Sequence, residues 1–169
     1  NILHPDEYSK RLLKLKKEYK MSLIFITHNL NLVQKISDYI IFLKDGEIIE
    51  EGETTKIFKN PKKNYTKKLI SLNKKLIINK QNFRKSNSEI LKVNNLSLNI
   101  NGKKILNKIN FELFKNDSLG IIGESGSGKT TISKCILKIH KAYSGDIFYN
   151  SKNIKSMSRL SSSKEIQIV

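Results

Sequence analysis

Hydrophobic residues in the first part of the chain change from a helical spacing to short runs that are apolar throughout. Residues 8–20 place leucines and tyrosines near helical spacing, which predicts a helix. The next run, "SLIFIT" at 22–27, is rich in Ile and Phe and apolar on both faces, as in a buried parallel strand. The sequence therefore predicts a helix that leads into a strand, and His28 follows that strand directly.

A hairpin and three short helices are expected after this strand. "HNLNLVQKIS" predicts a short helix with Asn29 as its N-cap. "DYIIFLKDGEIIEEG" places Asp45-Gly46 between two apolar runs, a strong signal for a β-hairpin. Two more short helices are expected in "ETTKIFKN" and, after Pro61, in "NYTKKLISL".

The second part of the chain predicts another hairpin and then a strand that runs into a glycine-rich loop. "ILKVNNLSLNI" and "KKILNKINFEL" flank Asn101-Gly102 and predict a hairpin over 90–114. "SLGIIG" predicts a buried strand, "KTTISKCILKIH" a helix and "SGDIFYNSKNI" a further strand and turn. Residues 73–89 are polar and lack a sustained period, so we interpret them as a linker between two parts.

Composition and charge narrow the classes of protein that the chain can represent. Its 169 residues carry 32 basic and 15 acidic side chains, a net charge of +17. Of the basic residues 29 are lysines, scattered among many Asn and Ile residues, whereas recognition of phosphates and bases favours the planar fork of Arg. No apolar run approaches the length of a membrane span, and no secretory leader opens the sequence. We therefore expect a globular protein without a nucleic-acid role.

The single cysteine and the three histidines are the remaining candidates for reactive side chains. Cys135 is the only cysteine, so no disulfide is expected, and its place in the helix after the loop indicates a small core residue. His4 and His140 have no distinctive setting and are interpreted as structural or surface residues. His28, at the end of a buried strand, is either a packed or surface histidine or a functional one.

The segment "GESGSGKTT" carries the chemistry of a phosphate-binding loop. It matches G-x-x-x-x-G-K-[ST], with an apolar strand before it and a helix after it. Gly126 and Gly128 let backbone N–H groups turn inward at a helix N-terminus, Lys129 supplies a charge for the terminal phosphates, and Thr130 supplies a hydroxyl for Mg²⁺. The alternative is that the segment has no binding role and is a glycine-rich turn followed by an incidental lysine. The nucleotide-binding residues that we predict are Gly123, Glu124, Ser125, Gly126, Ser127, Gly128, Lys129, Thr130 and Thr131.

These motifs resemble those of ABC-type ATPases. "GIIGESGSGKTT" is similar to their Walker A motif, and "SLIFITHNLNLVQKISDYIIFLKDGEIIEEG" resembles the segment with the switch histidine that closes such a domain. "IFKNPKKNYTKKLI" resembles the tail of ATPase subunits from oligopeptide, dipeptide and nickel importers. The resemblance implies that His28 is a catalytic residue that contacts the terminal phosphate and the attacking water. It also implies that ATP and Mg²⁺ are the cofactors.

The order of the motifs is the reverse of that in a single ABC domain, because the switch histidine comes before the Walker A motif. The resemblance therefore implies a fragment of a protein with two fused ATPase domains. Residues 1–72 would end the first domain, 73–89 would be the linker and 90–169 would begin the second. A Leu-Ser-Gly-Gly-Gln signature and a Walker B strand are absent from the sequence, so the fragment is expected to be inactive alone. The aromatic residue that stacks on adenine in the family would fall near Ile100.

The resemblance implies an ATPase that energises import of peptides or similar small solutes from the cytoplasmic face of the inner membrane. Its partners would be transmembrane permease subunits and a solute-binding protein, and its ATPase domains would pair head to tail. The alternative is a soluble tandem ABC ATPase that acts on ribosomes or nucleic acid, which the basic charge favours. The expected fold is α/β, a partial P-loop NTPase core with a parallel sheet plus an antiparallel hairpin. We expect strands 22–27, 118–122 and 38–43 side by side, with the 90–114 hairpin packed at one edge.

Overall fold

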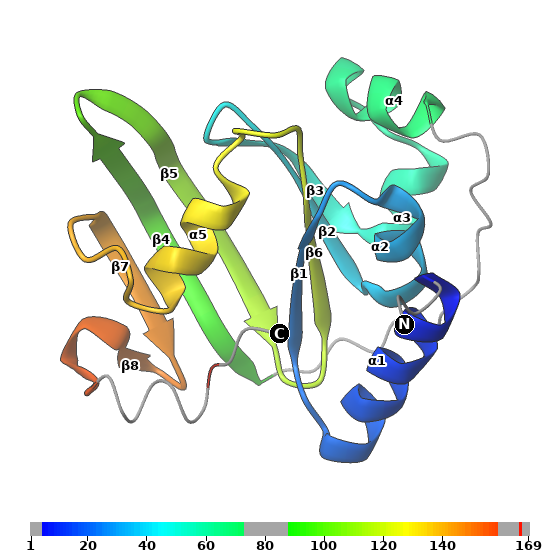
Figure 1. Ribbon diagram of the computed structural model, residues 1–169, viewed down its shortest axis with the longest axis horizontal. Coiled ribbons are helices and arrows are strands. Elements are labelled where there is room, and N and C mark those ends of the chain that lie inside the picture. The colour runs from blue at the N-terminus through cyan, green and yellow to red at the C-terminus, as the bar shows by residue number, and fades with distance from the viewer. Residues whose placement is uncertain (1–4, 73–87, 159–165, 167–169) are drawn as a thin grey trace.

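The computed structural model describes residues 5–72, 88–158 and 166 and forms two four-stranded sheets (Figure 1). The first part of the chain contains α1 (Pro5–Tyr19), β1 (Leu23–Thr27), α2 (Leu30–Ile36), β2 (Tyr39–Lys44), β3 (Glu47–Glu53), α3 (Thr54–Lys59) and α4 (Asn64–Ser71). The second part contains β4 (Glu89–Ile100), β5 (Lys103–Phe114), β6 (Ser118–Ile122), α5 (Lys129–Ile136), β7 (Ser144–Tyr149), β8 (Lys152–Asn153) and a single 3₁₀ turn at Ile154–Ser156. The predicted linker, 73–89, lies almost wholly outside the described residues, as do residues 1–4.

The first sheet has the strand order β1-β6-β2-β3 and confirms the predicted neighbours. Strand β6 from the second part pairs in parallel with β1 on one side and with β2 on the other, while β3 returns antiparallel to β2. All five residues of β6 are buried, because strands cover both of its edges and other elements cover both faces. The apolar runs of the two parts therefore bury one another.

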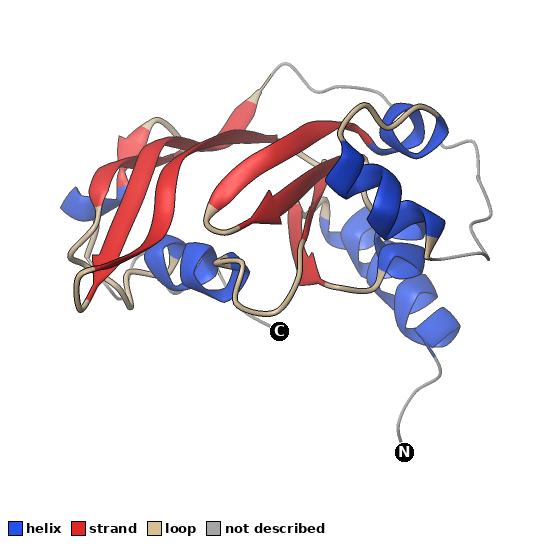
Figure 2. Ribbon diagram, turned by 90° about the horizontal axis from the view of Figure 1, so that it is seen from above, coloured by secondary structure: helices blue, strands red, loops and turns tan. Residues whose placement is uncertain are grey.

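Successive side chains of the central strands point to opposite faces of this sheet, so they belong to two hydrophobic clusters, one on each face. Ile40 and Phe42 of β2 pack with α2 and α3, whereas Ile41 and Leu43 face the cluster shared with α5 and the second sheet. Figure 2 shows α1 to α4 gathered beside the first sheet and α5 beside the second. The parallel sheet is thus an interior layer of the fold.

The second sheet has the order β5-β4-β7-β8 and is antiparallel throughout. The predicted hairpin, β4–β5, lies at one edge of the first sheet, because β5 packs beside the edge strand β3. The sequence did not predict that β7 pairs with β4, so that the hairpin belongs to a separate sheet. Its buried side chains, such as Val93 and Ile147, pack against β6 and α5 in one continuous core. The mixed α/β fold that the sequence predicts is confirmed.

Polar contacts at the start of β6 join the two parts of the chain. The Asp38 carboxylate accepts a hydrogen bond from the Ser118 backbone N–H at 2.7 Å and forms an ion pair with Lys16 of α1, also at 2.7 Å. On the other side of β6, the Ser22 hydroxyl donates to the Phe114 carbonyl at 3.1 Å and accepts from the Asn116 N–H at 2.8 Å. These contacts fix the amino-terminal ends of β1, β2 and β6 relative to one another.

Candidate nucleotide-binding site

The glycine-rich loop Gly123–Gly128 leaves the carboxyl end of β6 and enters α5 at Lys129. Gly126 and Gly128 have φ values of +81° and +102°, in the left-handed region that glycine adopts at little cost. A Cβ at Gly126 would meet nothing within 4 Å, so the loop is open there. A Cβ at Gly123 would lie 2.2 Å from the Leu43 carbonyl oxygen, so only glycine fits where the loop passes β2.

Lys129 folds back over this loop. Its ammonium donates to the carbonyl oxygens of Gly123 at 2.9 Å and Glu124 at 2.7 Å, and to the Ser127 hydroxyl at 3.3 Å. Partial burial lowers the pKa of Lys129 because the charged form loses solvation. The lysine therefore places a poorly solvated positive charge at the mouth of the loop, where an anion would be stabilised strongly.

The first turn of α5 supplies backbone N–H donors beside the positive charge of Lys129. The first N–H groups of a helix have no partner within the helix, and the helix dipole favours an anion at that end. Thr130 is exposed in this turn, so its hydroxyl is accessible. Magnesium usually takes few protein ligands and completes its shell with phosphate oxygens and water. The donor set around Lys129 and Thr130 therefore fits a nucleotide phosphate chain with Mg²⁺.

His28 reaches the same edge of the parallel sheet as the loop. Thr27 is paired with Ile122 in the last register position of β1 and β6, and His28 and Gly123 are the residues that follow. The His28 side chain is exposed. Asn29 caps α2 by accepting a hydrogen bond from the Leu32 N–H at 3.1 Å, which fixes the backbone directly after His28. The structure therefore brings His28 and the loop together although the sequence separates them widely.

Two contacts to the loop come from residues that sequence reasoning did not assign to the site. The Gly46 N–H, in the β2–β3 turn, donates to the Ser127 carbonyl at 3.0 Å. The Glu124 N–H donates to the hydroxyl of Tyr65 in α4 at 3.3 Å. The available sequence signals were the Asp45-Gly46 turn and the Tyr-Thr pair of the tail, and neither pointed to the loop.

The remaining predicted residues lie elsewhere. Ile100, near which we expect the adenine-stacking position, is 38% exposed at the β4–β5 turn. Cys135 is fully buried in the core, as predicted. His140 follows α5 and is partly exposed. His4 lies outside the described residues.

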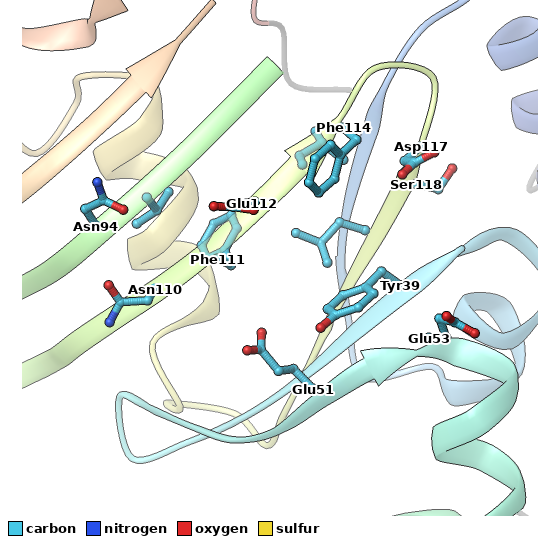
Figure 3. A pocket seen from close by; sticks show the side chains of 13 residues that line it. Tyr39, Glu51, Glu53, Asn94, Asn110, Phe111, Glu112, Phe114, Asp117 and Ser118 are labelled. Carbon is cyan, nitrogen blue, oxygen red and sulfur yellow. The ribbon is translucent and has the colours of Figure 1, made fainter. Parts of the chain in front are cut away.

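A separate cavity of about 320 Å³ lies near the opposite end of β6 (Figure 3). Tyr39 and Glu51 approach it from β2 and β3, and Phe111 and Glu112 approach it from β5. The cavity is acidic, since Glu51, Glu53, Glu112 and Asp117 line it. Burial, and then the negative charge of Glu112, raises the pKa of Glu51. Such a cavity would repel phosphates, so the loop after β6 remains the candidate site.

Comparison with known sequences shows what the part of the chain around this loop is similar to. Residues 106–169 match the family model described as ABC transporter. The matched range includes the whole loop and α5. Among the described residues, no helix is long and apolar enough to cross a membrane.

The similarity to known proteins also includes the first part of the chain, because the alignments to several relatives, all of which carry the same name, cover 85% of the whole chain. The chain is 27% identical to the glutathione import ATP-binding protein GsiA of Escherichia coli strain K12 over 179 aligned positions, which cover 85% of this chain and 29% of that protein. Proteins of the same name from Shigella dysenteriae serotype 1 and Escherichia coli O6:H1 are 27% and 28% identical with the same coverage. The chain therefore spans less than a third of the length of these relatives.

Proposed function

We propose that this chain binds ATP through Gly123–Thr131 and belongs to an ATPase that energises import of peptides or similar small solutes. The observation that carries the proposal is the loop between β6 and α5, where Lys129 and the first turn of α5 face an open glycine at Gly126. Import is supported by the tail that ends in α4 and by relatives whose printed name is glutathione import ATP-binding protein.

Each residue of the loop has a distinct role in this proposal. The backbone N–H groups around Gly126 and Gly128 would bind phosphate oxygens, and Lys129 would exchange part of its contact with the loop carbonyls for the terminal phosphates. The Thr130 hydroxyl would hold Mg²⁺, which supplies charge neutralisation to the phosphates when bound. His28 is the residue proposed to act on the terminal phosphate and the attacking water, in the complete protein at the site of its own domain.

Two fused ATPase domains are the second part of the proposal. The alignment to the relatives covers 85% of the chain, whereas residues 90–169 make up less than half of it. A single alignment therefore carries both the His28 segment and the loop in the order that this chain has. We assign residues 1–72 to the end of the first domain and 90–169 to the start of the second, with 73–89 as the linker. In the complete protein His28 and Lys129 would then serve different sites.

The proposed setting is peripheral, at the cytoplasmic face of the inner membrane, with permease subunits and a solute-binding protein as partners and head-to-tail pairing of the ATPase domains. The chain alone is expected to bind nucleotide without turnover, because it carries no signature motif and no Walker B strand. ATP hydrolysis is proposed for the complete protein only.

Isothermal titration of this chain with Mg-ATP tests the nucleotide site directly. Lys129→Ala should weaken binding at least tenfold, because it removes the charge that faces the phosphates. Lys134→Ala is the matched control, since Lys134 is an exposed lysine of the same helix α5, and its binding should equal that of the unmodified chain. Equal affinities for both variants would contradict the assignment.

The nucleic-acid alternative rests on the net charge of +17 and has its own test. If the chain binds RNA only through its general positive charge, its affinity for RNA should fall steeply as the salt concentration rises. RNA binding that persists at physiological salt and exceeds the affinity for Mg-ATP would favour the ribosome-associated protein.

A further inference from the structure

Helix α4 lies at the end of the parallel sheet from which the phosphate loop emerges (Figure 1). Its second residue, Tyr65, is partly buried and packs against the cluster that includes Phe42 and Ile122. The ammonium of Lys44 lies 5.4 Å from the centroid of the Tyr65 ring. The ring is therefore held between β2 and the end of β6.

The Tyr65 hydroxyl connects strand β2 to the loop. It donates to the Leu43 carbonyl at 3.5 Å and accepts from the Glu124 N–H at 3.3 Å. Burial, the main effect, and nearby acidic groups raise the pKa of Tyr65, so the phenol keeps its proton and can act as a donor at neutral pH. One hydroxyl thus holds two backbone positions that lie far apart in the sequence.

Glu124 is also held from its carbonyl side. That oxygen accepts hydrogen bonds from the Lys129 ammonium at 2.7 Å and from the Ser127 N–H at 3.2 Å. A continuous path of contacts therefore runs from Tyr65 through the backbone of Glu124 to Lys129. A shift of the Glu124 backbone would move a carbonyl that holds the proposed phosphate-binding lysine.

A buried carboxylate anchors α4 so that Tyr65 can hold this position. Glu50 of β3 accepts hydrogen bonds from the backbone N–H groups of Lys62 at 2.8 Å and Lys63 at 3.0 Å, immediately before the helix. These N–H groups belong to the helix entrance, where donors lack partners within the helix. The helix is thereby fixed to β3 at one point and to the loop at another.

We propose that in this chain Tyr65 is a positioning residue of the nucleotide site, and that through its hydroxyl the importer-type tail, which we assign to the first domain, sets the geometry of the phosphate loop, which we assign to the second. The inference rests on the proposed function, because it assumes that the loop binds nucleotide. It adds a role for the tail, which is otherwise a segment after the ATPase core. Tyr65 itself touches no phosphate in this proposal and acts through Glu124 and Lys129.

The test compares Tyr65→Phe with Tyr19→Phe. Phe keeps the ring and removes only the hydroxyl, and Tyr19 is a control because its side chain is 65% exposed on α1. In the nucleotide-free chain, hydrogen exchange of the Glu124 amide should become about fivefold faster in Tyr65→Phe, as expected from loss of one hydrogen bond. The affinity for Mg-ATP should fall about three- to tenfold. Tyr19→Phe should change neither quantity.

The two readouts separate failure of this inference from failure of the proposed function. If the unmodified chain binds no Mg-ATP, the proposed function fails, and Glu124 exchange still decides whether Tyr65 holds the loop. Unchanged Glu124 exchange in Tyr65→Phe overturns the contact, and unchanged affinity with faster exchange overturns the positioning role. If Tyr65→Phe does not fold, Mg-ATP added to the unmodified chain should shift the ring signals of Tyr65 and leave those of Tyr19 in place. Unshifted Tyr65 signals at saturating Mg-ATP would overturn the proposal.

Discussion

Thr27 and Ile122 are paired in the last register position of the parallel strands β1 and β6, so His28 and Gly123 leave the sheet at the same edge. The two residues come from parts of the chain that we assign to different ATPase domains. Their juxtaposition follows from burial, because β1, β6 and β2 are apolar runs that pair edge to edge, and two hydrophobic clusters cover the faces of their sheet. The edge therefore combines the residues that we propose for an ATPase site, although we assign them to two different domains.

Replacing His28 should separate binding from hydrolysis in the complete protein. In His28→Ala we expect the affinity for Mg-ATP to stay within about twofold and ATP turnover to fall at least tenfold, because the exposed imidazole is proposed to act on the terminal phosphate during reaction. Nucleotide titration and steady-state phosphate release measure the two quantities. His140→Ala, which changes a histidine after α5, should preserve both. A parallel loss of binding and turnover in His28→Ala would make this histidine structural.

Much of this arrangement could be predicted from the sequence because it depends on side-chain pattern. Runs that are apolar on both faces identified β1, β2 and β6, and the glycine and lysine spacing identified the loop. The contacts of the loop with Gly46 and Tyr65 could not be predicted. They involve the Ser127 carbonyl and the Glu124 N–H, backbone groups that every residue carries, and Tyr65 and Glu124 are 59 positions apart. The second sheet was also missed, because nothing in the spacing of the hairpin indicates that β7 pairs with β4.

The Glu50 carboxylate should stabilise the fold in a pH-dependent manner. Burial alone would raise its pKa, but the neighbouring Thr66 hydroxyl and the hydrogen bonds from the Lys62 and Lys63 backbone N–H groups lower the pKa of Glu50 below its usual value of 4.5. A lowered folded-state pKa gives stability that is present above 4.5 and is lost as the pH falls through the folded-state value. Glu50→Gln should therefore cost about 1–3 kcal/mol at pH 7 and progressively less in acid.

Urea unfolding of the Glu50→Gln variant at several pH values measures this difference. Glu53→Gln is the control on the same strand, since the Glu53 carboxylate pairs with Lys56, whose side chain is 75% exposed. Its effect should stay below about 1 kcal/mol at every pH. A cost for Glu50→Gln that did not change with pH would mean that the carboxylate charge contributes nothing.

Cys135 should be unreactive as long as the chain is folded. It is fully buried, and burial raises the pKa of its thiol from 9.0 to about 11. At pH 8 the thiolate fraction would then be roughly a hundredfold smaller than for an ordinary cysteine, and the thiolate is the reactive form. A disulfide reagent should label the chain only after denaturant is added. In a Cys135→Ala background, Ser71→Cys places a thiol at an exposed position of α4 and should react within the mixing time. Fast labelling of native Cys135 would show that the core opens.

The β2–β3 and β4–β5 turns form a matched pair that tests how the loop is held. Asp45-Gly46 and Asn101-Gly102 have nearly identical backbone angles, with φ values of 48° and 77° in the first turn and 49° and 76° in the second. Both are two-residue hairpin loops. A Cβ at Gly102 would meet nothing within 4 Å, whereas a Cβ at Gly46 would lie 2.2 Å from the Ile105 carbonyl oxygen. Substitution by Ala therefore adds the same backbone strain at both sites but a steric clash at only one.

Gly102→Ala should cost about 1–2 kcal/mol of unfolding free energy, the penalty of a left-handed backbone for an L-residue. Gly46→Ala should cost clearly more, because the Ile105 backbone must move away from the new methyl group. The displacement should also reach the nucleotide site, since the Gly46 N–H donates to Ser127 and the Gly46 carbonyl accepts from Asn107 at 2.9 Å. We therefore expect Gly46→Ala to weaken Mg-ATP binding several-fold under conditions where the chain is still folded. Gly102→Ala should bind as the unmodified chain does. Thermal unfolding and nucleotide titration of both variants give the comparison, and equal effects on stability and binding would show that the β2–β3 turn does not support the loop.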